Sequence, residues 1–357
     1  MSARKRFILF ALSVCLITML TSCKHGVSQD FNFVAGDTYI ALTDDSYIFM
    51  IMNGGKTTYY RQYLYEDTVK ELGVIENFVL STKGSAKVGQ SIYFTVVING
   101  GTSEYVGLYE IDLEENTLSE VARDNQCSYD AYTFSYGECV AIAKNIYGED
   151  KVQTYIDVYD PQDNKLFTIL NKEMNNESLE GAIILRACSD GDNLFTLMDI
   201  GTGGGSTPET SIVVCGQDGQ SRAVKQEKKI SLGSLEDYIM QARVFQMIVL
   251  NEYIYMSNYS NLSFFGKIDD DTISPIIEKH NLEFAGGGDK IVLYERGSNN
   301  IIIVNPRTGE YSDKTIAGKN NYSIKCILAN ETDALIVLKS AGKKDYVYRQ
   351  LISELVG

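Results

Sequence analysis

The sequence of 357 residues contains no tryptophan, only two histidines and only four prolines. Two histidines leave little material for a catalytic zinc site or a serine-type triad, because both depend on imidazole. The cysteines include no Cys-x-x-Cys pair, which argues against a redox dithiol and a zinc knuckle. We therefore predict no catalytic residue, no metal ligand and no cofactor site from these residue types.

An excess of positive charge is also missing. The chain has 32 basic and 47 acidic side chains, and its net charge is −15. Proteins that bind nucleic acid present a basic surface to the phosphates, so nucleic acid is not an expected partner. A hydrophobic fraction of 44% and a charged fraction of 22% are typical of a folded globular chain.

Residues 1–22 have the pattern of a secretory signal peptide. Arg4, Lys5 and Arg6 form a basic start, and an apolar run of 14 residues follows at 7–20. This run is too short for a standard membrane span and suits the apolar region of a signal peptide. We therefore expect this segment to direct export of the protein.

The signal ends in Leu20, Thr21, Ser22 and Cys23, an aliphatic residue and two small residues before a cysteine. This resembles the lipobox of bacterial lipoproteins at all four positions. The resemblance implies that the Cys23 sulfur carries a diacylglycerol and that cleavage precedes Cys23. It also implies an extracytoplasmic protein anchored by lipid to the cell membrane or outer membrane. The alternatives are an ordinary secretory signal with a coincidental cysteine, and an uncleaved anchor.

Cleavage before Cys23 would change the rest of the chain in two ways. It would remove three positive charges from a net charge of −15, leaving −18, and residues 23–30 would serve as a short tether. It would also leave five cysteines besides the lipidated one: Cys127, Cys139, Cys188, Cys215 and Cys326. Four of these cysteines lie in or beside apolar runs, so we expect them to be buried and to pack as small hydrophobic residues. A Cys127–Cys139 disulfide is the alternative.

The body of the chain repeats a hairpin pattern. Two β-rich runs end in Asn53-Gly54-Gly55 and Asn99-Gly100-Gly101, 46 residues apart, and each precedes a tyrosine-rich run. Asn-Gly between apolar runs is a strong hairpin signal, because both residues tolerate positive φ. The same two-run unit recurs five more times, at residues 137–146 with 154–159, 193–198 with 211–214, 252–256 with 263–268, 290–294 with 300–304, and 334–338 with 346–351.

Turns follow the second run of most units and lead into a short third strand, as at Asn305-Pro306-Arg307-Thr308-Gly309. A regular repeat of this length predicts an all-β β-propeller over residues 31–357. We expect seven blades, with six or eight as alternatives. The N-terminal strand at Phe31 to Val34 is expected to complete the last blade. Neither the Trp-Asp repeat signature nor the sialidase Asp box is present, so no propeller family is indicated.

We predict a binding module for a protein or glycan, with a scaffold subunit of an envelope complex as a further reading. The alternative is an extracytoplasmic glycan hydrolase or lyase that uses carboxylates lining the channel. No motif marks such carboxylates. Asp157, Asp160 and Asp163 recur every three residues, which weakly suggests calcium, but they lack the Asp-x-Asp-x-Asp-Gly pattern of a calcium loop. His280 is expected in a surface loop. The glycine-rich runs at 201–206 and 286–288 are predicted loops, and residues 234–243 a short helix or an irregular strand. Eight tyrosines are expected mostly in strand packing, with a tyrosine-rich binding face as the alternative: Tyr47, Tyr59, Tyr60, Tyr63, Tyr65, Tyr93, Tyr105 and Tyr109.

Overall fold

The computed structural model describes most of the chain beyond residue 32. The described ranges are 33–81, 84–125, 131–147, 151–175, 181–190, 193–201, 209–216, 221–226, 244–250, 252–258, 262–269, 272–287, 290–316 and 321–356. The predicted signal peptide, the predicted lipobox with Cys23 and the predicted tether lie outside them, as do Cys127 and residues 202–206 and 234–243. No helix in these ranges has the length and hydrophobicity that crossing a membrane requires.

The first half of the described chain forms antiparallel meanders of consecutive strands. Meander 1 comprises β1 (Thr38–Leu42), β2 (Ser46–Asn53), β3 (Lys56–Tyr63) and β4 (Val69–Glu76). Meander 2 comprises β5 (Phe78–Ser81), β6 (Ala86–Val88), β7 (Ser91–Asn99), β8 (Glu104–Asp112) and β9 (Thr117–Asp124), where β5 and β6 both pair with β7. Meander 3 comprises β10 (Tyr132–Tyr136), β11 (Cys139–Tyr147), β12 (Lys151–Asp160) and β13 (Lys165–Asn175).

The second half continues the pattern. Meander 4 comprises β14 (Gly181–Ser189), β15 (Asn193–Gly201), β16 (Glu209–Gly216) and β17 (Ser221–Gln226). Meander 5 comprises β18 (Val244–Leu250), β19 (Tyr253–Asn258), β20 (Leu262–Asp269) and β21 (Thr272–His280). Meander 6 comprises β22 (Leu282–Gly287), β23 (Ile291–Glu295), β24 (Asn300–Val304) and β25 (Tyr311–Thr315). Meander 7 comprises β26 (Ser323–Ala329), β27 (Asp333–Lys339) and β28 (Tyr346–Leu351), followed by the short helix α3 (Ile352–Val356).

The hairpins predicted from the repeated runs are all present, as the pairs β2–β3, β7–β8, β11–β12, β15–β16, β19–β20, β23–β24 and β27–β28. In the first of them Asn53 pairs with Lys56, and the two turn residues Gly54 and Gly55 have φ of 58° and 81°. Positive φ at both central positions is the geometry that matches strand twist in a two-residue hairpin. The turn therefore uses the two glycines rather than the Asn-Gly pair.

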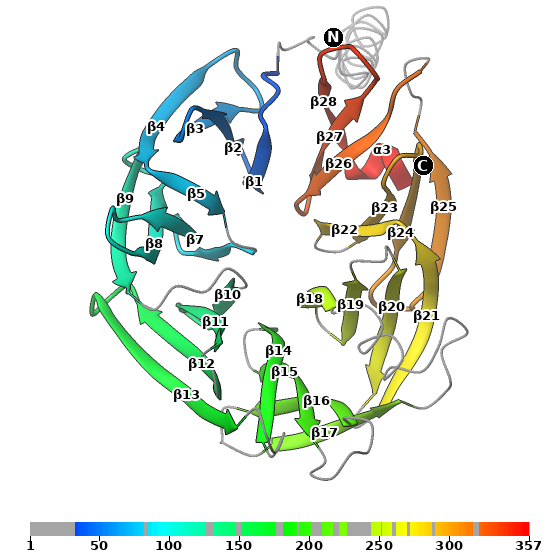
Figure 1. Ribbon diagram of the computed structural model, residues 1–357. Helices are drawn as coiled ribbons and strands as arrows, with labels where there is room; N and C mark the ends of the chain where they lie inside the picture. The colour runs from blue at the N-terminus through cyan, green and yellow to red at the C-terminus, as the bar shows by residue number, and fades with distance from the viewer. Residues whose placement is uncertain are drawn as a thin grey trace, which may run out of the picture. The chain divides into compact units, whose positions relative to one another are not determined.

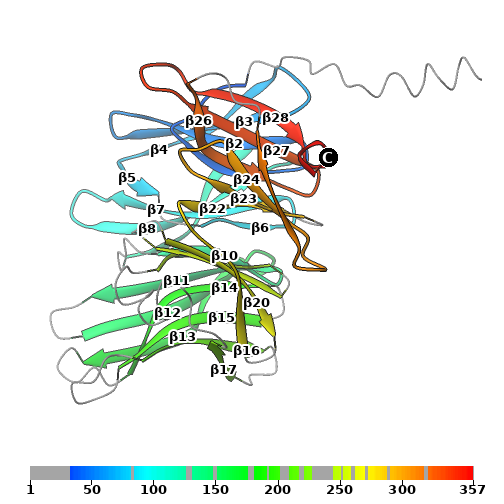
Figure 2. The same cartoon turned by 90° about the vertical axis from the view of Figure 1, so that its right-hand side faces the viewer.

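The meanders follow one another around a common centre, and the first strand of each lies nearest that centre (Figure 1). Figure 2, turned by 90°, shows many of the same strands along their length. The hydrophobic core is divided among the interfaces between neighbouring meanders. Ile48, Met50 and Tyr59 of meander 1, for example, pack against Ile92 and Phe94 of meander 2. The described chain is thus a β-propeller, as predicted, whereas seven as the number of blades stays a prediction.

Within the described ranges, two pairs of strands join neighbouring meanders. The outer strands β17 and β21 pair in parallel, and so do the first strands β22 and β26. In the second pair Gly286, at φ 126°, lies opposite Ala329, and a Cβ on Gly286 would come within 2.1 Å of the Ala329 carbonyl oxygen. The prediction that residues 286–288 form a loop is wrong for Gly286 and Gly287, which end β22 because only glycine permits this close approach.

The predicted closing strand is absent from the described residues. Phe33 and Val34 form no strand, and the sheet of meander 7 ends at β28. Instead, the Val34 amide donates to Gln62 Oε1 at 2.7 Å, and its carbonyl accepts from the Tyr47 hydroxyl at 2.9 Å. The polar groups of this segment are therefore directed to side chains of meander 1 and not to the edge of β28.

Meanders 1 and 7 are joined by side chains. Tyr47 and Phe49 of meander 1 share a buried cluster with Leu335, Val337 and Val347 of meander 7. The side-chain amide of Asn330 donates a hydrogen bond to the main-chain carbonyl of Thr43 at 2.7 Å across the same boundary. Packing and single hydrogen bonds hold the two ends of the described propeller together.

Candidate functional site

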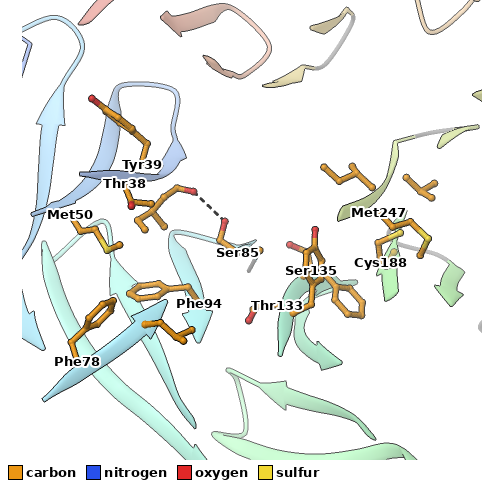
Figure 3. A pocket seen from close by; sticks show the side chains of 18 of the residues that line it. Thr38, Tyr39, Met50, Phe78, Ser85, Phe94, Thr133, Ser135, Cys188 and Met247 are labelled. Atoms are coloured by element: carbon orange, nitrogen blue, oxygen red, sulfur yellow. Dashed lines mark hydrogen bonds between the residues drawn. The ribbon is translucent and has the colours of Figure 1, made fainter. Parts of the chain in front are cut away.

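A pocket of about 710 Å³ opens at the centre of the propeller. Its walls come from the first strands β1, β5, β10, β14 and β18, with further residues from β2 and β7 and from the segment before β6. Figure 3 shows Thr38, Met50, Phe78 and Phe94 on one side of the pocket, and Cys188 and Met247 on the other. A volume of this size lies within the range of about 300–1,000 Å³ that is typical of ligand pockets.

Bulges shape the strands around this pocket. The register shifts between Tyr39 and Ala41 in β1, and between Phe78 and Leu80 in β5, which leaves Ile40 and Val79 as the extra residues. Both extra residues line the pocket. Among the described first strands, β14, β18, β22 and β26 also shift register, whereas β10 does not. A bulge turns a side chain out of the regular alternation, and here it directs apolar side chains to the centre.

The pocket wall is mainly apolar, and part of it is open. The Met52 side chain is 49% exposed and that of Val79 is 37% exposed, whereas Met50 and Phe94 are buried behind them. Met52 and Val79 are therefore the most exposed large apolar side chains of the described lining. Methionine adapts its shape to different partners more readily than branched residues do.

Hydroxyl groups supply the polar side chains of the wall. Ser85 Oγ donates to the Ile40 carbonyl at 3.5 Å, which links meander 2 to β1 across one side of the pocket (Figure 3). Ser135 Oγ donates to the Lys87 carbonyl at 3.2 Å, and Thr133 Oγ1 lies 2.9 Å from Thr95 Oγ1. Thr133 is buried, whereas Ser85 and Ser135 are half-buried. Because hydroxyls both donate and accept, these two serines can exchange their bonds for bonds to an incoming neutral polar group.

The twenty residues of the described ranges that line the pocket include no aspartate, glutamate, lysine, arginine or histidine. Their ionisable side chains are two tyrosines and Cys188. Burial raises the pKa of the Cys188 thiol, and burial also raises the pKa of the Tyr39 hydroxyl despite the hydrogen bond from the Gly36 amide. Cys188 and Tyr39 are therefore neutral at physiological pH. Among the described residues of the lining there is no carboxylate of the kind that the alternative glycan-cleaving function requires.

The acidic pattern at Asp157, Asp160 and Asp163 has a structural explanation. Asp157 is buried between strands, where its Oδ2 lies 2.6 Å from Lys144 Nζ and its Oδ1 accepts from Thr168 at 2.6 Å. Asp160 Oδ1 accepts from the main-chain amides of Gln162 and Asp163 in the turn after β12. Within the described ranges no group of three or more histidine, cysteine, aspartate or glutamate side chains could hold a metal ion.

Lys144 joins meander 3 to meander 2. Its ammonium pairs with Asp124 of β9 as well as with Asp157, and its side chain is only 6% exposed. Burial disfavours the charge, but the hydrogen bonds to Asp124 and Asp157 outweigh this, and the pKa of Lys144 is raised. This buried cluster is an inter-meander contact.

Most of the eight tyrosines singled out from the sequence are in strand packing, as predicted. Tyr47, Tyr59, Tyr93 and Tyr109 are buried, and only Tyr65 is exposed, at 50%. Arg123 covers the ring of Tyr105, with its guanidinium carbon 4.0 Å from the ring centroid. The tyrosine-rich binding face, which was the alternative, does not form from these residues.

The remaining candidates from the sequence are the cysteines and His280, and of these the described lining of the pocket contains Cys188. Cys188 lines the pocket and is buried, while Cys139 and Cys326 are partly buried free thiols in hydrophobic clusters. His280 ends β21, opposite Leu262, where the sequence predicted a loop. Its strand placement follows from the long β20–β21 ladder, which runs to the last residue before the turn at Asn281.

Comparisons with known proteins show the fold. No family model and no curated protein matches the sequence. The β-propeller domain of the trilobed protease from Pyrococcus furiosus, which has an open velcro topology, is 14% identical, with a TM-score of 0.53 over 88% of this chain and 98% of that domain. The Cps50 (Swd1) β-propeller domain of Myceliophteria thermophila is 11% identical, with a TM-score of 0.50 over 88% and 96%.

A third similar structure is a longer protein. Acylaminoacyl peptidase from Pyrococcus horikoshii is 13% identical, with a TM-score of 0.55 over 92% of this chain. The chain spans 54% of that peptidase's length. At these identities the likenesses establish a β-propeller and carry no activity over to this chain.

Sequence reasoning missed the strands that build the pocket. It identified the second, third and fourth strands of the meanders but not β1, β5, β10, β14 or β18. The register shifts in four of these five strands break the regular alternation of apolar and polar residues. These strands could have been predicted from the apolar residues that precede the hairpins, such as Phe78 and Leu80 in β5.

Proposed function

We propose that the protein is a lipid-anchored, extracytoplasmic binding module whose β-propeller holds a partner protein or glycan in the central pocket. The observation that carries the proposal is the neutral pocket itself, which has accessible apolar surface at Met52 and Val79 and hydroxyl groups beside it. Such a wall suits recognition by burial of apolar surface together with a few hydrogen bonds.

The chemistry of the pocket favours binding over bond cleavage. General acid–base catalysis near neutral pH needs groups that exchange protons in that range, commonly histidine or a carboxylic acid with a shifted pKa. The lining residues offer hydroxyls, thioethers and hydrocarbon instead. The proposed function is therefore that of a binding module and not that of a glycan hydrolase or lyase.

The pattern Leu20-Thr21-Ser22-Cys23 supports the anchor. We expect Cys23→Ser to abolish metabolic labelling with a radioactive fatty acid and to move the protein out of the membrane fraction. Cys15→Ser is the matched control, because it makes the same exchange within the apolar run of the signal. Labelling and membrane association of the Cys23→Ser variant equal to those of Cys15→Ser would disprove lipidation at Cys23.

The pocket is tested with one variant inside it and one outside it. Val79→Glu puts a charge on the accessible wall, and Val74→Glu makes the same exchange on β4, where Val74 is 45% exposed and does not line the pocket. The full-length proteins are crosslinked in membranes of the source organism, solubilised in mild detergent and purified. We expect a ligand recovered with wild type and Val74→Glu to be lost with Val79→Glu. Equal recovery with both variants would show that the pocket is not the binding site.

A further inference from the structure

A second pocket, of about 420 Å³, lies where meanders 1 and 2 meet. Its described lining comes from the connection between β4 and β5, from the turn between β7 and β8, and from β8 and β9. It shares no described residue with the central pocket. The second pocket differs from the central one in chemistry, because its described wall includes two charged side chains, two amides and two tyrosines: Glu76, Arg123, Asn77, Asn99, Tyr105 and Tyr109.

Arg123 is held in place on two sides. Its Nε and Nη2 atoms donate to the two carboxylate oxygens of Glu120 at 2.7 and 3.2 Å, and its guanidinium lies over the ring of Tyr105. Its Nη1 atom donates no hydrogen bond to a described residue, and the side chain is 52% exposed. The pocket therefore contains a guanidinium that is oriented before a ligand arrives, which lowers the entropic cost of binding.

The two asparagines are fixed through the main chain of the turns that carry them. Asn77 has a φ of 55°, and its carbonyl accepts from the main-chain amide of Asn99 at 2.9 Å. Asn99 Oδ1 accepts from the main-chain amide of Gly101 at 2.8 Å, so its side-chain NH₂ group is left for a ligand. Both asparagines are exposed. Their amides thus add donors and an acceptor to the same wall as Arg123.

The charged side chains of the described lining are already paired. Glu76 Oε1 lies 2.6 Å from Lys56 Nζ, and Arg123 is paired with Glu120. A charged ligand would have to displace one of these partners to gain a full ion pair of its own. A neutral hydroxyl, in contrast, can use the lone pairs and N–H groups that the existing pairs leave over. The pocket therefore favours a neutral polar ligand.

A sugar ring fits this combination of groups. Its hydroxyls both donate and accept, and planar amide, carboxylate and guanidinium groups can each bond to more than one of them. The C–H groups of a sugar ring are apolar, and Tyr105 and Tyr109 add aromatic surface to the wall. A volume of about 420 Å³ also lies within the range of about 300–1,000 Å³ that is typical of ligand pockets.

We propose that this second pocket binds a neutral sugar residue of a glycan. Arg123 Nη1 and the side-chain amides of Asn77 and Asn99 donate to oxygens of the sugar. The Glu76 carboxylate accepts from a hydroxyl, and the ring of Tyr105 contacts C–H groups. The inference goes beyond the proposed function, because it concerns a separate site and does not depend on what the central pocket holds.

The probes are neutral oligosaccharides of hexoses and N-acetylhexosamines, arrayed beside the corresponding uronic acids and amino sugars. Detergent-solubilised full-length protein is applied, and Kd values for the sugars that bind are measured by isothermal titration calorimetry. We expect neutral sugars to bind more tightly than their charged counterparts by about fivefold or more, which corresponds to about 1 kcal/mol.

Asn77→Gly removes one amide from the pocket without straining the turn, because glycine adopts positive φ readily. Asn281→Gly is the matched control. Asn281 has a φ of 59° and lies in the corresponding connection between β21 and β22, where its carbonyl accepts from the Arg296 main-chain amide at 2.9 Å. We expect Asn77→Gly to raise Kd by about fivefold, the effect of losing one neutral hydrogen bond, and Asn281→Gly to leave Kd unchanged.

Arg123→Met and Arg296→Met form a second matched pair, because the two side chains are 52% and 53% exposed and both pair with a glutamate. We expect Arg123→Met to raise Kd by about tenfold, because a charged donor is lost, and Arg296→Met to leave it unchanged. Circular dichroism establishes that all four variants are folded. The inference is overturned if no neutral sugar binds, if charged counterparts bind more tightly, or if Kd is equal within either pair.

Val79→Glu separates this site from the central pocket. Sugar binding in the second pocket should be unchanged in Val79→Glu. A sugar that is lost with Val79→Glu and retained by Asn77→Gly would belong to the central pocket, which would support the proposed function and overturn this inference. Equal recovery of the crosslinked ligand with Val74→Glu and Val79→Glu would reject the function of the central pocket, whereas losses of sugar binding confined to Asn77→Gly and Arg123→Met would still support the second pocket.

Discussion

Two arginines occupy equivalent positions in meanders 1 and 7, and each reaches the next meander around the propeller. Arg61 pairs in register with Ile48, and Arg349 pairs in register with Leu335, each the third residue of its partner strand. Arg61 Nη2 lies 3.0 Å from Asp45 Oδ1, and its Nη1 lies 2.9 Å from Asn116 Oδ1 in meander 2. Arg61 therefore links Asp45 of its own meander to Asn116, in the turn between β8 and β9 of meander 2.

Arg349 makes the corresponding contact where the ends of the propeller meet. Its Nε lies 2.6 Å from Asp333 Oδ1, and its guanidinium carbon lies 4.3 Å from the ring centroid of Tyr65 in meander 1. The Tyr65 hydroxyl donates to Asp333 Oδ2 at 3.2 Å. Asp333 is completely buried, and its carboxylate is held by these partners and by the Thr332 hydroxyl.

We expect Arg349→Met to destabilise the protein by about 3–5 kcal/mol, because it leaves a buried carboxylate without its cation. Urea unfolding followed by circular dichroism measures this loss. Arg296→Met is the control, since Arg296 is 53% exposed in its pair with Glu283 and the exchange should lower stability much less. Equal losses in the two variants would show that Arg349 does not secure the boundary between meanders 1 and 7.

At the scale of the elements, the hairpins were predictable and the strands before them were not. Runs such as residues 46–53 and 91–99 are long and β-rich, and they end in glycine turns, so local sequence determines them. The strand β5 has four residues and a bulge, and β1 has five residues and a bulge. Their pairing is decided by the adjacent hairpin rather than by their own pattern.

The candidate site follows from those unpredicted strands, which explains why sequence reasoning did not find it. The sequence marked no carboxylates for a channel, and Asp157, which belonged to a weak calcium-like pattern, lies between meanders with Lys144. The closing strand was expected because the hairpin count left one strand over at the N-terminus. Phe33 and Val34 instead contact Tyr47, by a ring contact at 6.0 Å and by the hydrogen bond to the Val34 carbonyl. Such side-chain contacts have no periodic signature.

At the scale of the whole molecule, tyrosine supplies much of the packing between meanders. The chain has 24 tyrosines, and Tyr255 and Tyr294 are buried in the clusters on the two faces of meander 6. Burial raises the pKa of Tyr255 to about 12, and burial raises that of Tyr294 well above the ordinary value. Burial likewise raises the pKa of Tyr348, in meander 7, to about 12.

These raised pKa values make stability depend on alkaline pH. The unfolded phenols ionise near pH 10, whereas the folded ones keep their protons up to about pH 12, so the folded state binds more protons between these limits. The contribution is fully present below pH 10 and is lost as pH rises toward 12. Lys144 contributes with the same sign, because its pKa is also raised in the folded protein.

We therefore expect the free energy of unfolding to fall between pH 10 and pH 12, by up to about 1.4 kcal/mol per pH unit for each buried tyrosine. Urea unfolding at a series of pH values measures this slope, and absorbance near 295 nm should show that phenol ionisation accompanies unfolding. Tyr255→Phe should reduce the slope, although loss of its hydrogen bond to the Leu282 carbonyl lowers stability at neutral pH. Tyr311→Phe is the matched control, because Tyr311 is 48% exposed. A stability that is constant from pH 8 to pH 11, or equal slopes in the two variants, would contradict the assignment of tyrosine burial as the source of the pH dependence.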